Sequence, residues 1–282
     1  MKGSSVPPPT VRQASVNGVS LMYLEQGQGA PVVFVHGVLS DYRVWEGQWE
    51  PVAQHYRSIV LTQRYYGVGP WPDGGEKFSL VTHVDDLAAF IRGLKAGPVH
   101  VVGWSYGGGI SLTLAVQHPD LVKSLFVYEH SLISIVTDPA DAKLLGEDRK
   151  DMLAQGETAF KAGDIAKAAR LLVDGINGQP GMFDTLPAAT RSATLDNART
   201  LPLQFGAPPP PPISCAQLGQ LKVPVAIAAG ELTRPFYRIL ADTASRCIPG
   251  SRLIVIPKGR HAAPPEAPSA FNEALLGFLK YN

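Results

Sequence analysis

The sequence predicts an α/β protein with a mostly parallel, doubly wound sheet and a helical insertion. Two apolar runs, at 32–35 and 99–102, have the continuous valine-rich character of strands buried on both faces. Strand and helix patterns alternate along most of the chain, which is typical of a parallel sheet covered by helices. Between about 131 and 205 alanine-rich helical patterns dominate. This change from alternating strand and helix patterns to helical patterns alone predicts the insertion.

The amino-acid composition indicates which broad classes of protein the chain fits. The 282 residues are 45% hydrophobic and 17% charged, which suits a soluble protein with a sizeable core. A net charge of +1 gives no argument for a nucleic-acid partner or an anionic membrane surface. No apolar run approaches the roughly 20 residues of a membrane span. Residues 1–10 are expected to form a disordered lead, with no apolar segment of a signal peptide.

The number of cysteines indicates the redox environment in which the protein is expected to reside. Cys215 and Cys247 are the two cysteines of the chain. Two thiols in a chain of this length give no disulfide framework and fit a reducing environment. We therefore expect a cytoplasmic protein.

The first half of the chain reads as strands separated by loops and helices. Strands are expected at 19–24, 32–35, 58–61, 99–102 and 121–128. Helices are expected near 44–50, at 82–94 and from the glycines after Ser105 to about 118. Residues 63–75 form a loop rich in Gly and Pro. Thr82 is the expected N-cap of its helix, and Asp85 and Asp86 are expected to be solvated residues of the first turn.

The second half contains the insertion and then resumes the alternation. Helices are expected at 141–154, 157–162, 164–174 and 187–199, followed by a stiff proline linker at 208–212. A strand at 223–228, a helix at 236–245, a strand at 252–256 and a helix at 268–281 complete the chain. The expected division is a core of 1–130 and 214–282 with a helical cap of 131–213.

One stretch carries a chemical signature. Gly103-Trp104-Ser105-Tyr106-Gly107 fits G-x-S-x-G, the nucleophile elbow, and lies between a valine-rich strand and a helix pattern. A strand that turns sharply into a helix crowds its neighbours, so glycines are needed on either side. The serine then sits on strained backbone with its hydroxyl above the sheet. Ser105 is therefore the candidate nucleophile.

A serine nucleophile needs a base and an acid. His261 is best placed as the base, because its loop follows the last strand and so meets the elbow at the same edge of a parallel sheet. His130 is a weaker rival. Two carboxylates at strand ends, Glu129 and Glu231, are each able to hold the imidazole tautomer. The residues alone leave that choice open.

These residues resemble the α/β-hydrolase fold family. The order is His36-Gly37, then the elbow around Ser105, then a helical block, then the loop of His261, and the resemblance spans nearly the whole chain from about residue 19. In many members the acid lies three residues after a glycine that ends the penultimate strand, and that position is Thr233 here. Other members, including some haloalkane dehalogenases, place a glutamate after the strand that follows the elbow.

The resemblance therefore favours Glu129 as the acid. It also implies an oxyanion hole built from the backbone N–H of Tyr106 and of Val38. Trp104 flanks the nucleophile and either lines the substrate pocket or packs in the core. Dehalogenase activity does not carry over, because those enzymes have an aspartate where this chain has Ser105.

The predicted function is a serine hydrolase that cleaves a small, largely apolar carboxylic ester through a Ser-His-Glu triad and an acyl-enzyme. Hydrolysis of a carbon–carbon bond, a lactone or an amide on the same triad is an alternative, as is a ligand-binding or signalling protein that keeps the fold without catalysis. We expect a small-molecule substrate and no cofactor or metal. The oligomeric state stays open.

Overall fold

The fold is built on one eight-stranded sheet. The computed structural model describes residues 7–282, and the strand order is β1-β2-β4-β3-β5-β6-β7-β8. β1 pairs antiparallel with β2, and β2 pairs antiparallel with β4, whereas the remaining neighbours are parallel. The strands are β1 (Thr10–Val16), β2 (Val19–Gln26), β3 (Pro31–Val35), β4 (Arg57–Leu61), β5 (Val99–Trp104), β6 (Val122–Tyr128), β7 (Val225–Gly230) and β8 (Arg252–Ile256). The mostly parallel sheet is thus confirmed.

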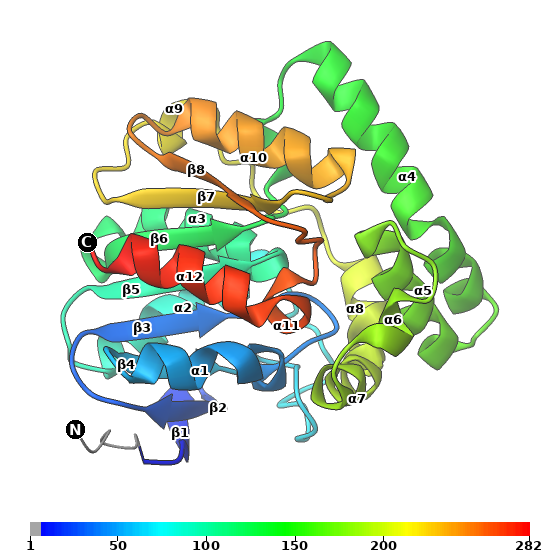
Figure 1. Ribbon diagram of the computed structural model, residues 1–282. Coiled ribbons are helices and arrows are strands. Elements are labelled where there is room, and N and C mark those ends of the chain that lie inside the picture. Colours follow the sequence, from blue (N-terminus) through cyan, green and yellow to red (C-terminus); the bar gives the residue numbers. More distant parts are fainter. Residues whose placement is uncertain (1–6) are drawn as a thin grey trace.

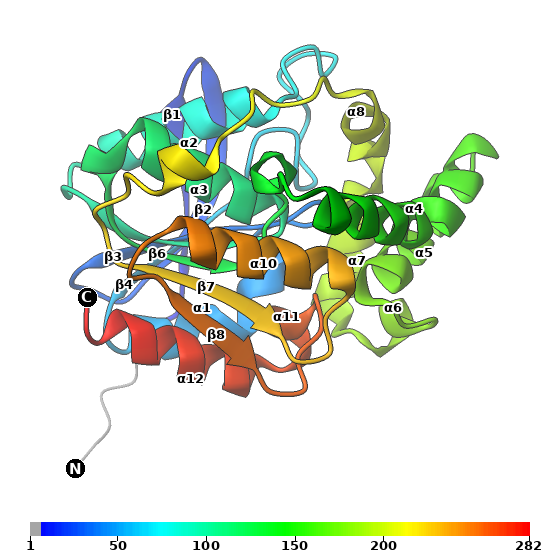
Figure 2. The same cartoon turned by 90° about the horizontal axis from the view of Figure 1, so that it is seen from above.

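Helices cover both faces of this sheet (Figures 1 and 2). One face carries α1 (Glu46–Ala53) and α12 (Pro268–Leu279), and the other carries α2 (Leu80–Gly93), α3 (Tyr106–Gln117) and α10 (Pro235–Cys247). The central strands supply apolar side chains to both sides in alternation: Val33 packs on the α2–α3 side and Phe34 on the α1–α12 side. This two-sided burial is why the strands read as continuous apolar runs.

The helical block between β6 and β7 lies beside the ends of the strands, at the right of Figure 1. It consists of α4 (Pro139–Lys161), α5 (Ile165–Asn177), α6 (Met182–Thr185), α7 (Ala188–Asp196) and α8 (Leu201–Gly206). The short α9 (Cys215–Leu218) packs against α10, and α11 (Ala263–Glu266) precedes α12. Single 3₁₀ turns occupy Tyr42–Trp45, Pro119–Leu121, Ile133–Ile135 and Asn197–Thr200. The core and cap boundaries given above stay a prediction.

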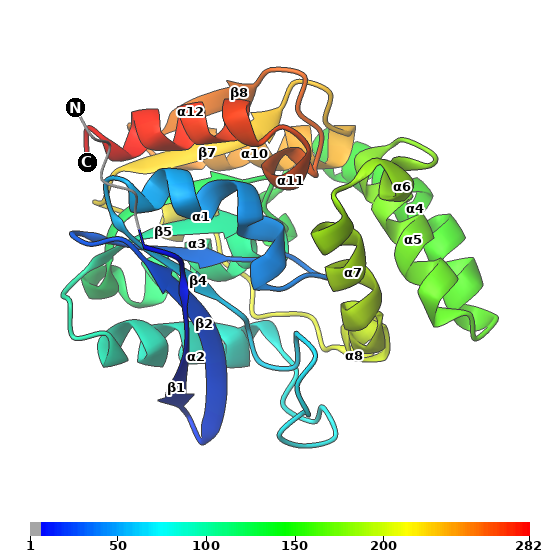
Figure 3. The same ribbon diagram turned by 60° about the horizontal axis from the view of Figure 1, so that its bottom comes forward.

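Three local expectations differ from the structure. Residues 1–6 of the expected disordered lead lie outside the described part, but Thr10 already begins β1, which forms a hairpin with β2 through Asn17 and Gly18 (Figure 3). Helix α2 is capped by Ser79, whose hydroxyl accepts from the Thr82 amide, so the predicted cap lies one turn too late. Its Asp86 is buried rather than solvated, because it forms a two-fold hydrogen-bonded ion pair with Arg64.

The prediction of free thiols was wrong. Cys215 and Cys247 form a disulfide across 32 residues of sequence. Their spacing gave no hint of this, because α9 and the end of α10 meet only through tertiary packing. The bond removes the cysteine argument for a reducing compartment. Across residues 7–282, no helix has both the length and the apolar character to cross a bilayer.

Candidate active site

The stretch around Ser105 has the geometry of a nucleophile elbow. β5 ends at Trp104 and α3 begins at Tyr106, so Ser105 alone makes the turn. Its φ of 57° and ψ of −120° are strained for a residue with a side chain. A Cβ on Gly107 would meet the carbonyl oxygens of Val35 and His36, and one on Gly37 would lie 2.9 Å from the Ser105 Cβ. Glycine at both positions lets the loop after β3 approach the serine.

His261 and Glu129 form a buried pair beside this serine. Glu129 directly follows β6, and His261 lies in the loop between β8 and α11. Nδ1 of His261 is 2.8 Å from Oε2 of Glu129, and the other carboxylate oxygen accepts from the Gly230 amide at 2.8 Å. The Glu129 side chain is fully buried. The carboxylate therefore has a fixed orientation toward the imidazole.

The other candidate residues are directed elsewhere. Glu231 is exposed, and its carboxylate accepts from the Lys258 amide at 2.8 Å, which closes a turn. His130 is buried, accepts from the Leu132 amide, and lies 3.2 Å from the Leu240 carbonyl oxygen. Burial lowers the pKa of His130 to about 4, so the ring is neutral at pH 7. The structure thus places Ser105 and His261 on the wall of one cavity, pairs His261 with Glu129, and leaves out these two.

Two backbone amides near Ser105 are free to donate. Among the hydrogen bonds of residues 7–282, none is donated by the Val38 or the Tyr106 amide. Tyr106 is the first residue of α3, where backbone N–H groups have no partner within the helix. Its phenol contacts His83 Nδ1 at 2.9 Å, which directs the side chain away from the serine. Both amides are available to a negatively charged oxygen.

His36 supports the loop that carries Val38. Its Nδ1 donates to the Gly37 carbonyl at 2.8 Å, and its Nε2 accepts from the Gln63 amide at 3.1 Å. Burial lowers the pKa of His36 to about 4, which keeps the ring neutral. This histidine is a structural part of the loop.

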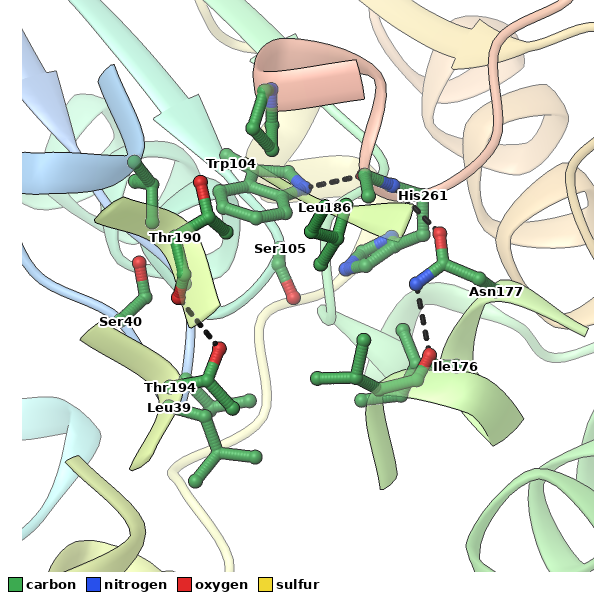
Figure 4. Close-up of a pocket in the computed structure, with 16 residues that line it drawn as sticks. Leu39, Ser40, Trp104, Ser105, Ile176, Asn177, Leu186, Thr190, Thr194 and His261 are labelled. Carbon is green, nitrogen blue, oxygen red and sulfur yellow. Dashed lines mark hydrogen bonds between the residues drawn. The ribbon is translucent and has the colours of Figure 1, made fainter. Parts of the chain in front are cut away.

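A mostly apolar cavity lies over Ser105 (Figure 4). It holds about 480 Å³ of space not filled by atoms, part of it open to solvent. The core contributes Val38, Trp104 and His261, and the helical block contributes side chains that sequence patterns did not single out: Val173, Ile176, Asn177, Leu186, Thr190 and Thr194. Apart from His261, the described residues that line it have no ionisable side chain. Trp104 therefore lines the pocket as well as packing in the core.

Residues from several elements fix the histidine loop. The Trp104 indole donates to the His261 carbonyl at 2.9 Å, and the Ala262 amide donates to the Asn177 side chain at 2.8 Å. The ring of Tyr237, from α10, stacks on the imidazole with centroids 4.1 Å apart. Sequence reasoning missed Asn177 and Tyr237, because each reaches the site from a helix whose packing no local pattern reveals.

Comparisons with known proteins identify the family. A family model described as the alpha/beta hydrolase fold matches residues 30–268. A 2-(acetamidomethylene)succinate hydrolase of Mesorhizobium japonicum is 24% identical, with 95% of this chain and 94% of that protein aligned. A 2-hydroxy-6-oxo-6-(2'-aminophenyl)hexa-2,4-dienoic acid hydrolase of Metapseudomonas resinovorans is 34% identical over 40% of each chain.

Solved structures agree on the fold. The carboxylesterase CesB of Bacillus subtilis has a TM-score of 0.76 at 16% identity, covering 98% of this chain and 93% of its own. A serine hydrolase of carbazole degradation, CarC, has a TM-score of 0.67 at 23% identity, covering 98% and 100%. At these identities the likeness concerns the architecture alone. With the family model matched over most of its length and relatives named as hydrolases, the chain belongs to the alpha/beta hydrolase fold family and is a hydrolase.

Proposed function

We propose that this hydrolase cleaves small, uncharged carboxylic esters through Ser105, His261 and Glu129. The observation that carries the proposal is the strained Ser105 beneath an apolar cavity, next to an imidazole whose Nδ1 lies 2.8 Å from a buried carboxylate. A hydroxyl becomes a good nucleophile only when a base takes its proton.

Acylation of Ser105 is the first step. His261 Nε2 accepts the hydroxyl proton while Oγ attacks the ester carbonyl carbon. The carbonyl electron pair moves onto the oxygen, which the Val38 and Tyr106 amides stabilise; one such donor is typically worth about 10²–10³ in rate. When the carbonyl re-forms, the C–O bond to the alcohol breaks and the imidazolium gives its proton to the departing oxygen. The products are an alcohol and acyl-Ser105.

Water then releases the acid. His261 takes a proton from a water molecule, whose oxygen attacks the acyl carbon. Collapse of the second tetrahedral intermediate breaks the bond to Oγ, and the proton on His261 returns to Ser105. Glu129 holds the imidazole in place and stabilises the imidazolium in both steps.

The cavity supports an uncharged substrate. Transferring a carboxylate into an apolar site is costly unless a cation pairs with it. The described residues that line the cavity include no Lys or Arg. The names of two sequence relatives refer to a succinate and to a dienoic acid, both carboxylates. A cavity of this composition favours esters without such a group.

Replacement of the nucleophile tests the proposal. We expect Ser105→Ala to lose nearly all hydrolysis of activated esters and all labelling by a fluorophosphonate probe, with an unchanged unfolding temperature. Ester turnover by the wild type, steady-state kinetics of the variant and mass spectrometry of the labelled protein measure this. If the variant kept more than a small fraction of the rate, Ser105 would not be the nucleophile. A wild type that neither turns over esters nor reacts with the probe would favour a non-catalytic ligand-binding role.

The names of the relatives favour two alternative reactions. Their names refer to hydrolysis of an acetamidomethylene group and of an oxo-dienoic acid, so amide or carbon–carbon cleavage on the same residues is the alternative. A panel that includes an activated ester, a lactone, an amide and a vinylogous diketone separates these reactions. The substrate with the highest kcat/KM identifies the chemistry.

A further inference from the structure

Tyr237 makes an unusual contact with the candidate base. Its ring lies nearly parallel to the His261 imidazole, with centroids 4.1 Å apart and 17° between the planes. Both rings are buried. A parallel stack at this distance covers one face of the imidazole and leaves the ring edges, with Nδ1 and Nε2, for hydrogen bonds.

Tyr237 is also near the other two candidate catalytic residues. Burial and the charge of Glu129 raise the pKa of its phenol, while the Ser105 hydroxyl lowers it. The phenol is therefore neutral at pH 7 and an electron-rich ring. It is not among the residues that line the cavity over Ser105. Its ring contacts the base, and its phenol lies near the Ser105 hydroxyl.

The helix that carries Tyr237 is anchored to the helical block. Arg234, just before α10, contacts Asp148 through Nε at 3.1 Å and Nη2 at 2.7 Å, and donates to the Gly175 carbonyl. The Phe236 amide donates to the same Asp148 carboxylate at 3.0 Å. These bonds fix the first turn of α10, and with it the position of the tyrosine ring.

We propose that Tyr237 is a positioning residue, whose ring holds the His261 imidazole against Glu129 and stabilises its charged form through the aromatic face. The inference rests on the proposed function, in which the imidazole becomes positively charged during both steps. A cation over a desolvated aromatic face is attracted by the electron density of the ring. Because the charge exists in the transition state and not in the resting enzyme, the contact lowers the barrier rather than tightening substrate binding.

A series of ring substitutions that keeps the packing, together with one variant that removes the ring, tests this. Tyr237→Phe keeps the ring and should retain kcat within about 3-fold of the wild type. Fluorinated phenylalanines at the same position withdraw electron density step by step, and kcat should fall with each added fluorine. Tyr237→Leu removes the ring and should lower kcat between about 3-fold and 30-fold. KM should change little throughout.

The pH profile provides a readout that a packing role would not move. Glu129 is the charged group in direct contact with the imidazole. Without the ring the imidazolium is less stable, so the acid limb of kcat/KM should move to lower pH in Tyr237→Leu and stay in place in Tyr237→Phe. Phe90→Leu is the matched control, since Phe90 is also a buried aromatic residue but lies on α2, where its ring packs against Tyr23. It should lower the unfolding temperature and leave the acid limb where it is.

The outcomes separate the two proposals. If wild-type turnover is normal but kcat is independent of fluorine content and the acid limb of Tyr237→Leu is unmoved, Tyr237 does not act on the imidazole. If the wild type neither hydrolyses esters nor reacts with a fluorophosphonate, the proposed function itself fails. Should Tyr237→Leu not fold, the fluorinated series alone decides.

Discussion

Glu129 and Glu231 stand at the ends of neighbouring parallel strands, β6 and β7, yet their surroundings differ. The Glu129 carboxylate is buried between the Gly230 amide and His261. The Glu231 carboxylate is exposed and accepts from Lys258. A carboxylate shielded from water interacts more strongly with a developing imidazolium charge, because the local dielectric constant is lower. The comparison of these two residues is therefore a sharp test of the proposed triad.

We expect Glu129→Gln to lower kcat by about 10⁴-fold and Glu231→Gln to have little effect. The Gly230 amide requires an acceptor, so the glutamine oxygen would face it and the NH₂ group would face His261. Nδ1 would then have to accept, which moves the imidazole proton to Nε2, where it blocks proton transfer from Ser105. Steady-state kinetics of both variants, with their unfolding temperatures, measure this. Equal losses in the two variants would contradict the assignment.

At the scale of single residues, sequence motifs predicted the candidates Ser105 and His261. They missed the side chains that reach the site through tertiary packing. Ser105 and His261 stand in loops at the carboxyl ends of parallel strands, which meet at one edge of the sheet. Asn177 and Tyr237 reach the same place from helices α5 and α10. No spacing rule connects a residue of the helical block to residue 262. Their contacts with the histidine loop arise from the packing of these helices.

Among the elements, α4 and α10 are joined by a compact ionic contact. The Arg234 and Asp148 side chains are only 12% and 15% exposed, whereas Asp151, the second carboxylate on Arg234, is 78% exposed. Asp148 in addition accepts from the Phe236 amide, at the start of α10. Removal of one member leaves buried polar groups without a partner, which costs more than the loss of a solvated pair.

Asp148→Ala should lower the free energy of unfolding by about 1–3 kcal/mol, and Asp151→Ala by less than about 1 kcal/mol. The difference follows from burial, since both carboxylates contact the same guanidinium. Urea unfolding followed by circular dichroism compares the two variants. Equal losses of unfolding free energy in the two variants would show that burial of Asp148 does not set the strength of this contact.

Most element types were predictable, but some boundaries were not. The continuous apolar character of β3 and β5 follows from burial on both faces, so these strands stand out in the sequence. β1 is an edge strand with mostly exposed residues, and it was missed. The Asn17-Gly18 dipeptide, with positive φ at both residues, was the available hairpin signal. Helix α4 continues through 155–156, where the sequence prediction divided it.

For the molecule as a whole, buried histidines couple stability to pH. Burial lowers the pKa of His36, His100 and His130 to about 4 and that of His83 to about 3. An unfolded chain protonates histidine below about pH 6.5. Between pH 6.5 and 4 the unfolded state therefore binds protons that the folded state does not. By linkage, the contribution of these residues is fully present above pH 6.5 and is lost as the pH falls toward 4.

We therefore expect the free energy of unfolding to fall steeply between pH 6.5 and 5, by about 2 kcal/mol for each of the four histidines. Their sum is a large part of the roughly 5–15 kcal/mol that stabilises a typical domain, so acid unfolding should begin near pH 5.

Urea titrations at several pH values measure the slope of the unfolding free energy against pH. His130→Gln should make it shallower by about a quarter, and the exposed His55 provides the control, since His55→Gln should leave it unchanged. An unfolding free energy that is flat from pH 7.5 to 5 would contradict neutral burial of these rings. Because ester hydrolysis should also decline on acidification as His261 takes up a proton, initial rates must be measured before any unfolding to keep the two effects apart.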